Sequence, residues 1–357
     1  MLLGICGALC SGKKTVAQYL VDHHGFQQLY LEHPSSSPGS PSPNGVSEST
    51  SALASTSVNG TPVRQTGRKP ETTFPTAEAL LDFVTTRWRS RWVTTDIHTE
   101  PILDLLSRRP FFILISTSAP LLTRYRRHQS HPHRAPLSLE DFVSSSDDHL
   151  FNPDTGLQPL ISRATVRLIN SSSDLAHLYA TLGKLDLANE DRLRPSWDSY
   201  FMSLASLAAR RSNCMKRRVG CVLVGRTRRV ISTGYNGTPR GLRNCADGGC
   251  PRCNSGSTSG ASLATCLCIH AEENALLEAG RDRIRDGAVL YCDTCPCLTC
   301  SIKICQVGIS EVVYSQGYSM DSETAAVFSE AGVKLRQFIP PPEGLIHLEK
   351  PDLGLAL

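Results

Sequence analysis

Apolar and polar positions alternate along the first half of the chain in a strand-and-helix pattern. A short apolar run leads through a glycine-containing loop into a segment with Val16, Ala17 and Leu20 at helical spacing, which predicts strand, loop and helix. Further strands are expected at 111–116 and 164–170, a basic helix at 121–127, and a helix capped within 171–174. We therefore predict an α/β domain over residues 1–185.

The pattern changes at Ser196, a favourable N-cap residue followed by aromatic and leucine positions at helical spacing, so a helix is expected to about Arg211. The hairpin strands are predicted at 219–224 and 230–233, later strands at 288–292, 311–314 and 333–338, and helices at 270–278, 296–307 and 322–331, closed by Gly280, Gly308 and Gly332. A hairpin followed by such alternation predicts a mixed five-stranded sheet covered by helices on both faces.

Composition sets the remaining boundaries. Between about 34 and 70 the chain is rich in Ser, Pro, Gly and Thr and poor in large apolar residues, so we predict a disordered insertion in the first domain. The charged segment 186–195 is expected to be a linker, 196–340 a second domain, and 341–357 a C-terminal tail.

Charge and cysteine usage narrow the function classes. The net charge of +4 with a pI near 8.4 includes no run of Lys and Arg that would indicate a nucleic-acid groove. No apolar run approaches the length of a membrane span, and the first ten residues do not read as a secretion signal. Twelve of the 14 cysteines lie between Cys214 and Cys305. We expect reduced thiols that bind metal, in the cytoplasm or also the nucleus.

Two short motifs carry the candidate chemistry. His270, Cys297 and Cys300 supply an imidazole and two thiolates, three positions of a tetrahedral catalytic zinc with the fourth open to water. Glu272 stands two residues after the histidine and can serve as general acid and base. A Cys-x-x-Cys pair alone could be a redox dithiol or half of a structural site. The pattern H-x-E…P-C-x-x-C favours a catalytic zinc, because a structural site has no use for the glutamate.

The glycine loop near the N-terminus indicates phosphate binding. Gly7, Gly12 and Lys13 match a loop that surrounds phosphates at a helix start. Lys14 occupies the position where a magnesium-binding Ser or Thr is expected, and Thr15 comes one residue late. The segment resembles the start of P-loop small-molecule kinases such as dephospho-coenzyme A and nucleoside monophosphate kinases. We favour a P-loop-derived scaffold without catalytic activity over a working kinase. Binding of Mg²⁺ together with a nucleotide regulator is a further expectation.

Residues 196–338 resemble the deoxycytidylate (dCMP) deaminases of the cytidine deaminase superfamily, and the two-part arrangement is similar to the fungal form. The likeness rests on the segments 216–221, 234–239, 270–275 and 296–300. It implies a three-layer α/β/α domain and hydrolysis of dCMP to dUMP and ammonia, supplying dUMP for thymidylate synthesis. It also implies that Glu272 protonates N3 and the departing amine, that the backbone around Ala271 holds the base carbonyl, and that Asn236 meets the sugar.

The same resemblance implies regulation by dCTP or dTTP and assembly into a homo-oligomer, a hexamer in this family. Several alternatives stay open from the residues themselves. These are a deaminase acting on another cytosine nucleotide or on nucleic acid, a bifunctional P-loop kinase and deaminase, and a zinc-binding interaction protein without activity.

More cysteines are present than one catalytic site needs. The surplus comprises Cys214, Cys245, Cys250, Cys253, Cys266 and Cys268. Some relatives hold a second, structural zinc in this region, so we expect one here, with Cys245 and Cys250 as its safest ligands. Cys221, Cys292 and Cys305 are interpreted as buried core thiols.

Overall fold

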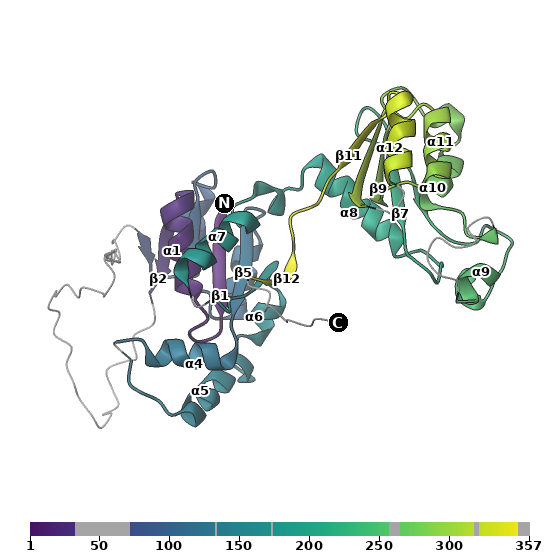
Figure 1. Cartoon of the computed structure of the whole chain (residues 1–357). Coiled ribbons are helices and arrows are strands. Elements are labelled where there is room, and N and C mark those ends of the chain that lie inside the picture. The colour runs from purple at the N-terminus through teal and green to yellow at the C-terminus, as the bar shows by residue number, and fades with distance from the viewer. Residues whose placement is uncertain (33–71, 133, 173, 257–264, 318–320, 349–357) are drawn as a thin grey trace. The chain divides into compact units, whose positions relative to one another are not determined.

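The computed structural model describes residues 1–32, 72–132, 134–172, 174–256, 265–317 and 321–348. The predicted disordered insertion at about 34–70 lies outside these residues. The chain forms two compact units (Figure 1), one made of Met1–Asn189 with Pro342–Leu357 and the other of Glu190–Pro341. Each unit has its own sheet and its own core.

The first unit is built on a seven-stranded sheet in the order β12-β6-β5-β1-β4-β2-β3. Its strands are β1 (Leu2–Gly7), β2 (Gln27–Leu31), β3 (Thr73–Phe74), β4 (Trp92–Thr94), β5 (Phe112–Ser118), β6 (Val166–Ile169) and β12 (Gly344–His347). All pairs are parallel. Every residue of the central strand β1 is buried, as expected when helices cover both faces.

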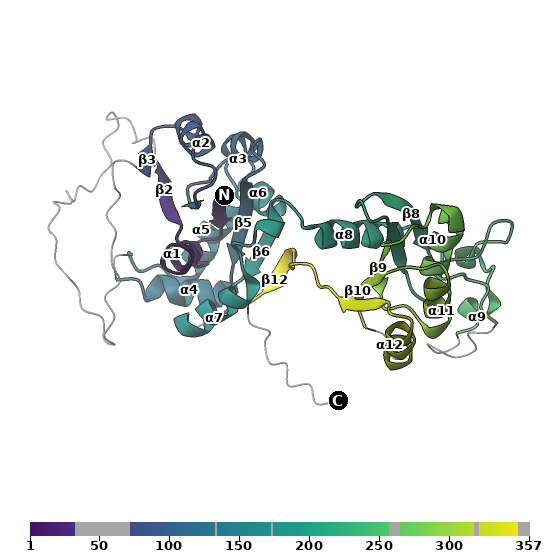
Figure 2. The ribbon, with the colours of Figure 1, turned by 90° about the horizontal axis from the view of Figure 1, so that it is seen from above.

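The helices of this unit are α1 (Lys13–His24), α2 (Ala77–Thr85), α3 (Glu100–Ser107), α4 (Leu121–Gln129), α5 (Leu139–Phe151), α6 (Gln158–Ser162) and α7 (Leu175–Leu185). Figure 2 shows α2, α3 and α6 on one face of the sheet and α1 and α7 on the other. The elements predicted within 1–185 are confirmed as β1, α1, β5, α4, β6 and α7. Strand β2, the strands and helices from Thr73 to Ser107, α5 and α6 were not predicted.

The end of the chain differs from the predicted tail. Gly344–His347 form β12, which pairs with β6 in the register Gly344 to Val166 and His347 to Ile169. Backbone bonds from Gly344 N to Thr165 O (3.0 Å) and from Leu348 N to Ile169 O (3.0 Å) extend this ladder. The edge of β6 is therefore covered by a strand that follows it by more than 170 residues.

The second unit contains the predicted mixed five-stranded sheet, in the order β11-β10-β9-β7-β8. Its strands are β7 (Gly220–Val224), β8 (Val230–Tyr235), β9 (Val289–Thr294), β10 (Glu311–Gln316) and β11 (Lys334–Gln337). The hairpin β7–β8 and the pair β7–β9 are antiparallel, whereas β9, β10 and β11 are parallel. The parallel half places the carboxyl ends of β9 and β10 at one edge.

Helices cover both faces of this sheet. They are α8 (Trp197–Ala209), α9 (Pro251–Asn254), α10 (Ala271–Ala279), α11 (Leu298–Gln306) and α12 (Asp321–Glu330). Strand β7 shows the alternation that separates the layers, because Val222 packs in a core with α8 and Leu223 in one with α10, α11 and α12. This gives a three-layer α/β/α fold. In the part of the chain that the structure describes, no helix is long and apolar enough to cross a membrane.

Candidate active site

The two halves of the zinc motif lie at the first residues of two helices. His270 is the N-cap of α10 and Cys297 the N-cap of α11, both with extended backbone and neither capping its helix with the side chain. Their side chains are thus available to a ligand. Lys303 of α11 donates to Glu273 of α10 (2.7 Å), which ties the two helices together beside the site.

The three expected ligands converge. His270 Nδ1 lies 3.3 Å from both Cys297 Sγ and Cys300 Sγ, and the three donor atoms are all within 4.8 Å of one another. In a tetrahedral zinc site, bonds of the usual length place such nitrogen and sulfur atoms about 3.6 Å apart. The set therefore fits a zinc ion bound through Nδ1 and two sulfurs, with a fourth position left for water.

The electrostatics of the site suit proton transfer. Glu272 is only 4% exposed, and this burial raises the pKa of its carboxyl to about 7. Hydrogen bonds with Cys300 and His270 lower the pKa of the Cys297 thiol to about 3 despite its burial. The result is a thiolate suited to metal binding and a carboxyl that can gain or lose a proton near neutral pH.

Asn236, expected at the substrate sugar, is embedded in the protein. Its Oδ1 accepts from Val219 N (2.9 Å) and Ser212 Oγ (2.7 Å), and its Nδ2 donates to Arg217 O (2.7 Å). Three of the four hydrogen bonds that an amide can make are thus used inside the protein. The side chain holds the loop after β8 against the segment that follows α8. The part played by Ser212 had no signal in the sequence.

Ala271, the other expected substrate contact, begins α10 and is fully buried. A side chain on Gly234 of β8 would overlap the Ala271 carbonyl oxygen and approach Ala275 N (2.5 Å). Gly234 therefore allows β8 and the first turn of α10 to touch. Gly237 continues this contact through backbone bonds with Ile269 (2.9 and 3.2 Å).

The Cys-Pro-Cys segment is held from two sides. The Thr324 hydroxyl of α12 donates to Pro296 O (2.9 Å), and Cys295 N donates to Gln316 O (2.8 Å) at the end of β10. The residues that are held, Cys295 and Pro296, directly precede Cys297. Neither Thr324 nor Gln316, which hold them, belongs to a motif. They fix the backbone from which two of the three expected ligands project.

Most of the remaining cysteines belong to one of two groups. Cys221 and Cys292 face each other across β7 and β9 in the core, which confirms their interpretation as buried core thiols. Cys305 packs against the same core but is only partly buried. The other surplus cysteines form one buried cluster of their own. Within the described ranges all of them are free thiols.

The glycine loop of the first unit, proposed from the sequence as a phosphate site, lies between β1 and α1. Gly12 caps α1 with φ 97° and Gly7 has φ 147°, conformations that favour glycine. Lys13 Nζ donates to Gly7 O (3.4 Å), and burial lowers the pKa of this lysine. Arg127 of α4 binds the loop from outside, since it donates to Cys10 O and Ser11 O (3.4 Å each).

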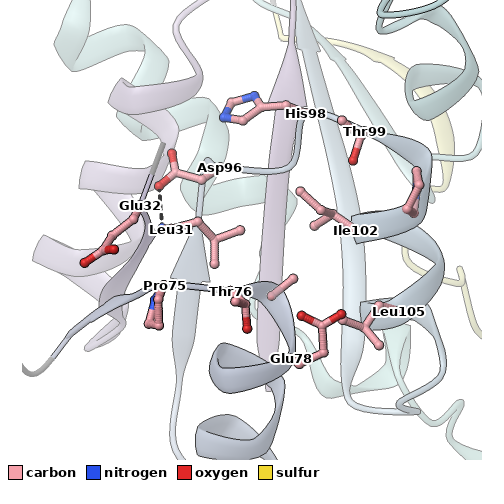
Figure 3. Close-up of a pocket in the computed structure, with 12 residues that line it drawn as sticks. Leu31, Glu32, Pro75, Thr76, Glu78, Asp96, His98, Thr99, Ile102 and Leu105 are labelled. Carbon is pink, nitrogen blue, oxygen red and sulfur yellow. Dashed lines mark hydrogen bonds between the residues drawn. The ribbon is translucent and has the colours of Figure 1, made fainter. Parts of the chain in front are cut away.

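A pocket of about 440 Å³ lies at the same edge of the parallel sheet, where β2, β3 and β4 end (Figure 3). Three carboxylates belong to its wall, those of Glu32, Glu78 and Asp96. Asp96 accepts a hydrogen bond from Leu31 N (3.0 Å), the dashed line of Figure 3. This acidic pocket and the basic glycine loop thus lie along one sheet edge with opposite charge.

Comparison with known proteins places the fold and the site in one class. Residues 195–316 match the family model of the cytidine and deoxycytidylate deaminase zinc-binding region. A deoxycytidylate deaminase of Schizosaccharomyces pombe is 48% identical over 343 residues, covering 96% of this chain and 99% of that protein. The Saccharomyces cerevisiae deoxycytidylate deaminase is 42% identical over 95% of this chain and 96% of its own. The chain belongs to the deoxycytidylate deaminase family.

The similarity to the fungal proteins includes the first unit. By contrast, a deoxycytidylate deaminase of Mycobacterium phage D29 is 45% identical over 126 residues, which are 34% of this chain and 95% of the phage protein. The phage protein therefore matches about a third of this chain, whereas the two yeast proteins match nearly all of it.

Proposed function

We propose that this chain converts dCMP and water into dUMP and ammonia, and so supplies dUMP for thymidylate synthesis. One observation carries the proposal. His270, Cys297 and Cys300 converge at two helix starts, and Glu272 is buried in the first turn of one of them. Membership of the deoxycytidylate deaminase family over nearly the whole chain supports the substrate.

The residues divide the work of hydrolysis. His270, Cys297 and Cys300 would hold the zinc ion, and that ion would supply the nucleophile for C4 of the base by lowering the pKa of a water molecule. Glu272 would take one proton from that water and pass it to N3. It would then take the second proton from the new C4 hydroxyl and pass it to the amine, which leaves as ammonia while the C4 carbonyl forms. The low exposure of Glu272 excludes bulk water from these transfers.

Two further residues are proposed to orient the nucleotide. The first-turn N–H groups of α10, beginning at Ala271, have no partner inside the helix and can donate to the base carbonyl. Asn236 supports the sugar side of the site. Because three of its hydrogen bonds are internal, we assign it chiefly to positioning the loop 234–239, with at most one N–H left for the sugar.

The test is ammonia release measured side by side with dCMP, dCTP, deoxycytidine and single-stranded DNA. The proposal expects dCMP to react with the highest kcat/KM. Glu272→Ala should lose turnover while it keeps its zinc, because the carboxyl lies outside the ligand set. Preference for single-stranded DNA would favour the nucleic-acid alternative. Turnover in the zinc-loaded Glu272→Ala variant would exclude the proposed proton path.

The first unit is proposed to bind the phosphates of a nucleotide at Gly7, Gly12 and Lys13. The positive φ angles of Gly7 and Gly12 and the nearby Lys13 cation support this. A regulator such as dCTP or dTTP, with Mg²⁺, is the occupant that the resemblance implies. Binding of dCTP to the full chain, lost in Lys13→Ala, would support the assignment. Magnesium-dependent phosphate transfer from ATP would favour the bifunctional kinase instead.

The cluster of surplus cysteines is proposed to hold structural zinc in addition to the catalytic ion. So many free thiols require a reducing compartment, for which we propose the cytoplasm or the nucleus. A homo-oligomer, a hexamer by resemblance, is a further proposal. Sedimentation of the full chain with and without dCTP would measure it.

A further inference from the structure

The surplus cysteines are brought together from three separate stretches of the second unit. One follows α8, three lie in and around α9 and the 3-10 turn before it, and two directly precede His270. We name them the thiol cluster: Cys214, Cys245, Cys250, Cys253, Cys266 and Cys268. The thiol cluster is well shielded, because Cys245 and Cys250 have no exposed surface and Cys253 and Cys268 are no more than 7% exposed.

The thiol cluster contains two overlapping sets of four sulfurs. One set is Cys214, Cys245, Cys253 and Cys268, and the other is Cys250, Cys253, Cys266 and Cys268. Within each set all the sulfur atoms lie within 4.8 Å of one another. Cys253 and Cys268 belong to both sets. Cys245 and Cys250, expected to share one zinc, fall into different sets.

The spacing of the sulfurs fits tetrahedral thiolate sites. Cys253 Sγ lies 3.9 Å from Cys214 Sγ, 3.9 Å from Cys266 Sγ and 4.0 Å from Cys268 Sγ. Four thiolates at the usual zinc–sulfur bond length are about 3.8 Å apart. Disulfide sulfurs are only about 2 Å apart, and these cysteines are free. Two tetrahedra that share the edge from Cys253 to Cys268 would use all six sulfurs.

A single ion would use only one set and leave two thiols of the other without metal. The hydrogen-bond donors favour use of both sets. Met215 N donates to Cys245 Sγ (3.5 Å) in the first set, and Leu267 N donates to Cys250 Sγ (3.4 Å) in the second. These donors stabilise thiolates at one unshared position of each set.

Charge supports the same conclusion. Six thiolates with two divalent ions carry a net charge of −2, which is costly in a buried site unless a cation lies nearby. Arg252 is 8% exposed and donates from Nη1 to Cys266 Sγ (3.7 Å). A buried guanidinium therefore lies beside the second set, where it offsets part of this charge.

We propose that the thiol cluster binds two zinc ions bridged by the sulfurs of Cys253 and Cys268, so that the chain carries three zinc ions. This inference rests on the structural zinc proposed above and fixes its number and ligands. The thiol cluster also lies close in sequence to His270, an expected ligand of the catalytic zinc. Cys268 is two residues from His270, and Ile269 between them pairs with Gly237. The two ions would thus anchor the backbone that presents His270.

The first test is the zinc content of the full chain, measured by native mass spectrometry and by elemental analysis after purification under reducing conditions. Three zinc ions per chain are expected. Two would overturn the bridged pair and leave a single structural ion, and one would overturn structural zinc altogether. Iron in place of zinc would overturn the assignment of the metal. None of these results depends on deaminase activity, so a wrong substrate assignment is detected separately.

Variants separate shared from unshared ligands. Cys250→Ser should lose one zinc and Cys253→Ser two, while Cys305→Ser, outside both sets, should retain three. Equal loss of zinc in Cys250→Ser and Cys253→Ser would contradict the bridge.

Since Cys253→Ser could fail to fold, the wild-type protein with cadmium in place of zinc provides a second measurement. Cadmium NMR should show two tetrathiolate signals coupled to each other; a single tetrathiolate signal would overturn the proposal.

Discussion

The carbonyl oxygen of Ala271 occupies the space that a side chain on Gly234 would need. Strand β8 thereby sets the position of the first turn of α10, which contains Glu272 and follows His270. The obstructing atoms belong to the backbone, so they cannot move away as a flexible side chain would. The geometry of the site therefore depends on a glycine that is not one of the expected metal ligands.

We therefore expect Gly234→Ala to lower kcat/KM for dCMP about 100-fold, because displacement of the reacting groups by about 1 Å has effects of this size. Steady-state ammonia release measures it. Gly225→Ala is the matched control in the same hairpin, since its new methyl group would meet nothing closer than Ile231 Cδ1 at 3.6 Å. Equal kcat/KM in both variants would show that α10 does not depend on this contact.

A second prediction concerns Asp198 of α8 and its pH dependence. Asp198 accepts from Arg336 (2.8 and 3.1 Å) and from the Tyr291 hydroxyl (2.8 Å). Burial raises the pKa of Asp198, but these hydrogen bonds lower it by a larger amount. The pKa of Asp198 therefore lies below its ordinary value. The carboxylate thus stabilises the fold above the unfolded-state pKa of about 4, and this contribution is lost as the pH falls through the folded-state pKa.

Asp198→Asn should accordingly reduce the free energy of unfolding by about 1–3 kcal/mol at pH 7. The difference from wild type should become smaller below about pH 4, where the wild-type carboxylate gains a proton. Urea unfolding followed by circular dichroism at several pH values measures both. Asp282→Asn, at an exposed position in the same unit, is the control. A difference that stays constant down to pH 3 would rule out the ionic contribution.

The candidate site was predictable because its information is local. His270 and Glu272 lie within three residues, Cys297 and Cys300 within four, and each motif also begins a helix that closes at a glycine. The internal bonds of Asn236 were not predictable, since Ser212 carries no motif and the bond to Arg217 is made to its backbone carbonyl. The sorting of Cys245 and Cys250 into different sulfur sets likewise depends on distances between segments that sequence spacing does not specify.

Several of the elements that were missed in the first unit are very short strands or pair with distant residues. Strands β3 and β4 contain two and three residues, too few for a periodic pattern. Strand β12 has only four residues with partly exposed positions. In the sequence, the whole second unit lies between β12 and its partner β6. A pairing of that kind is stabilised by the completed sheet and has no local sequence signal.

A third prediction tests the role of β12. Deletion of 343–357 should lower the melting temperature of the first unit and increase aggregation, because it exposes the unpaired edge of β6. Deletion of 349–357 alone leaves β12 in place and is the control. Differential scanning calorimetry with light scattering would separate the two. If both truncations melt like the full chain, the pairing of β12 with β6 contributes nothing measurable to stability.

The last prediction concerns Arg127, which holds the glycine loop in place. Besides its bonds to the loop, its Nη2 donates to Asn170 O (3.1 Å) and Ser172 O (2.6 Å), so one guanidinium joins the loop to the segment after β6. Charged hydrogen bonds of this kind each contribute about 1.5–3 kcal/mol. If the loop binds phosphates as proposed, Arg127→Met should weaken dCTP binding by calorimetry at least about 10-fold, while Arg126→Met, at an exposed neighbour, should not. Equal affinities of these two variants would show that Arg127 does not organise a phosphate site.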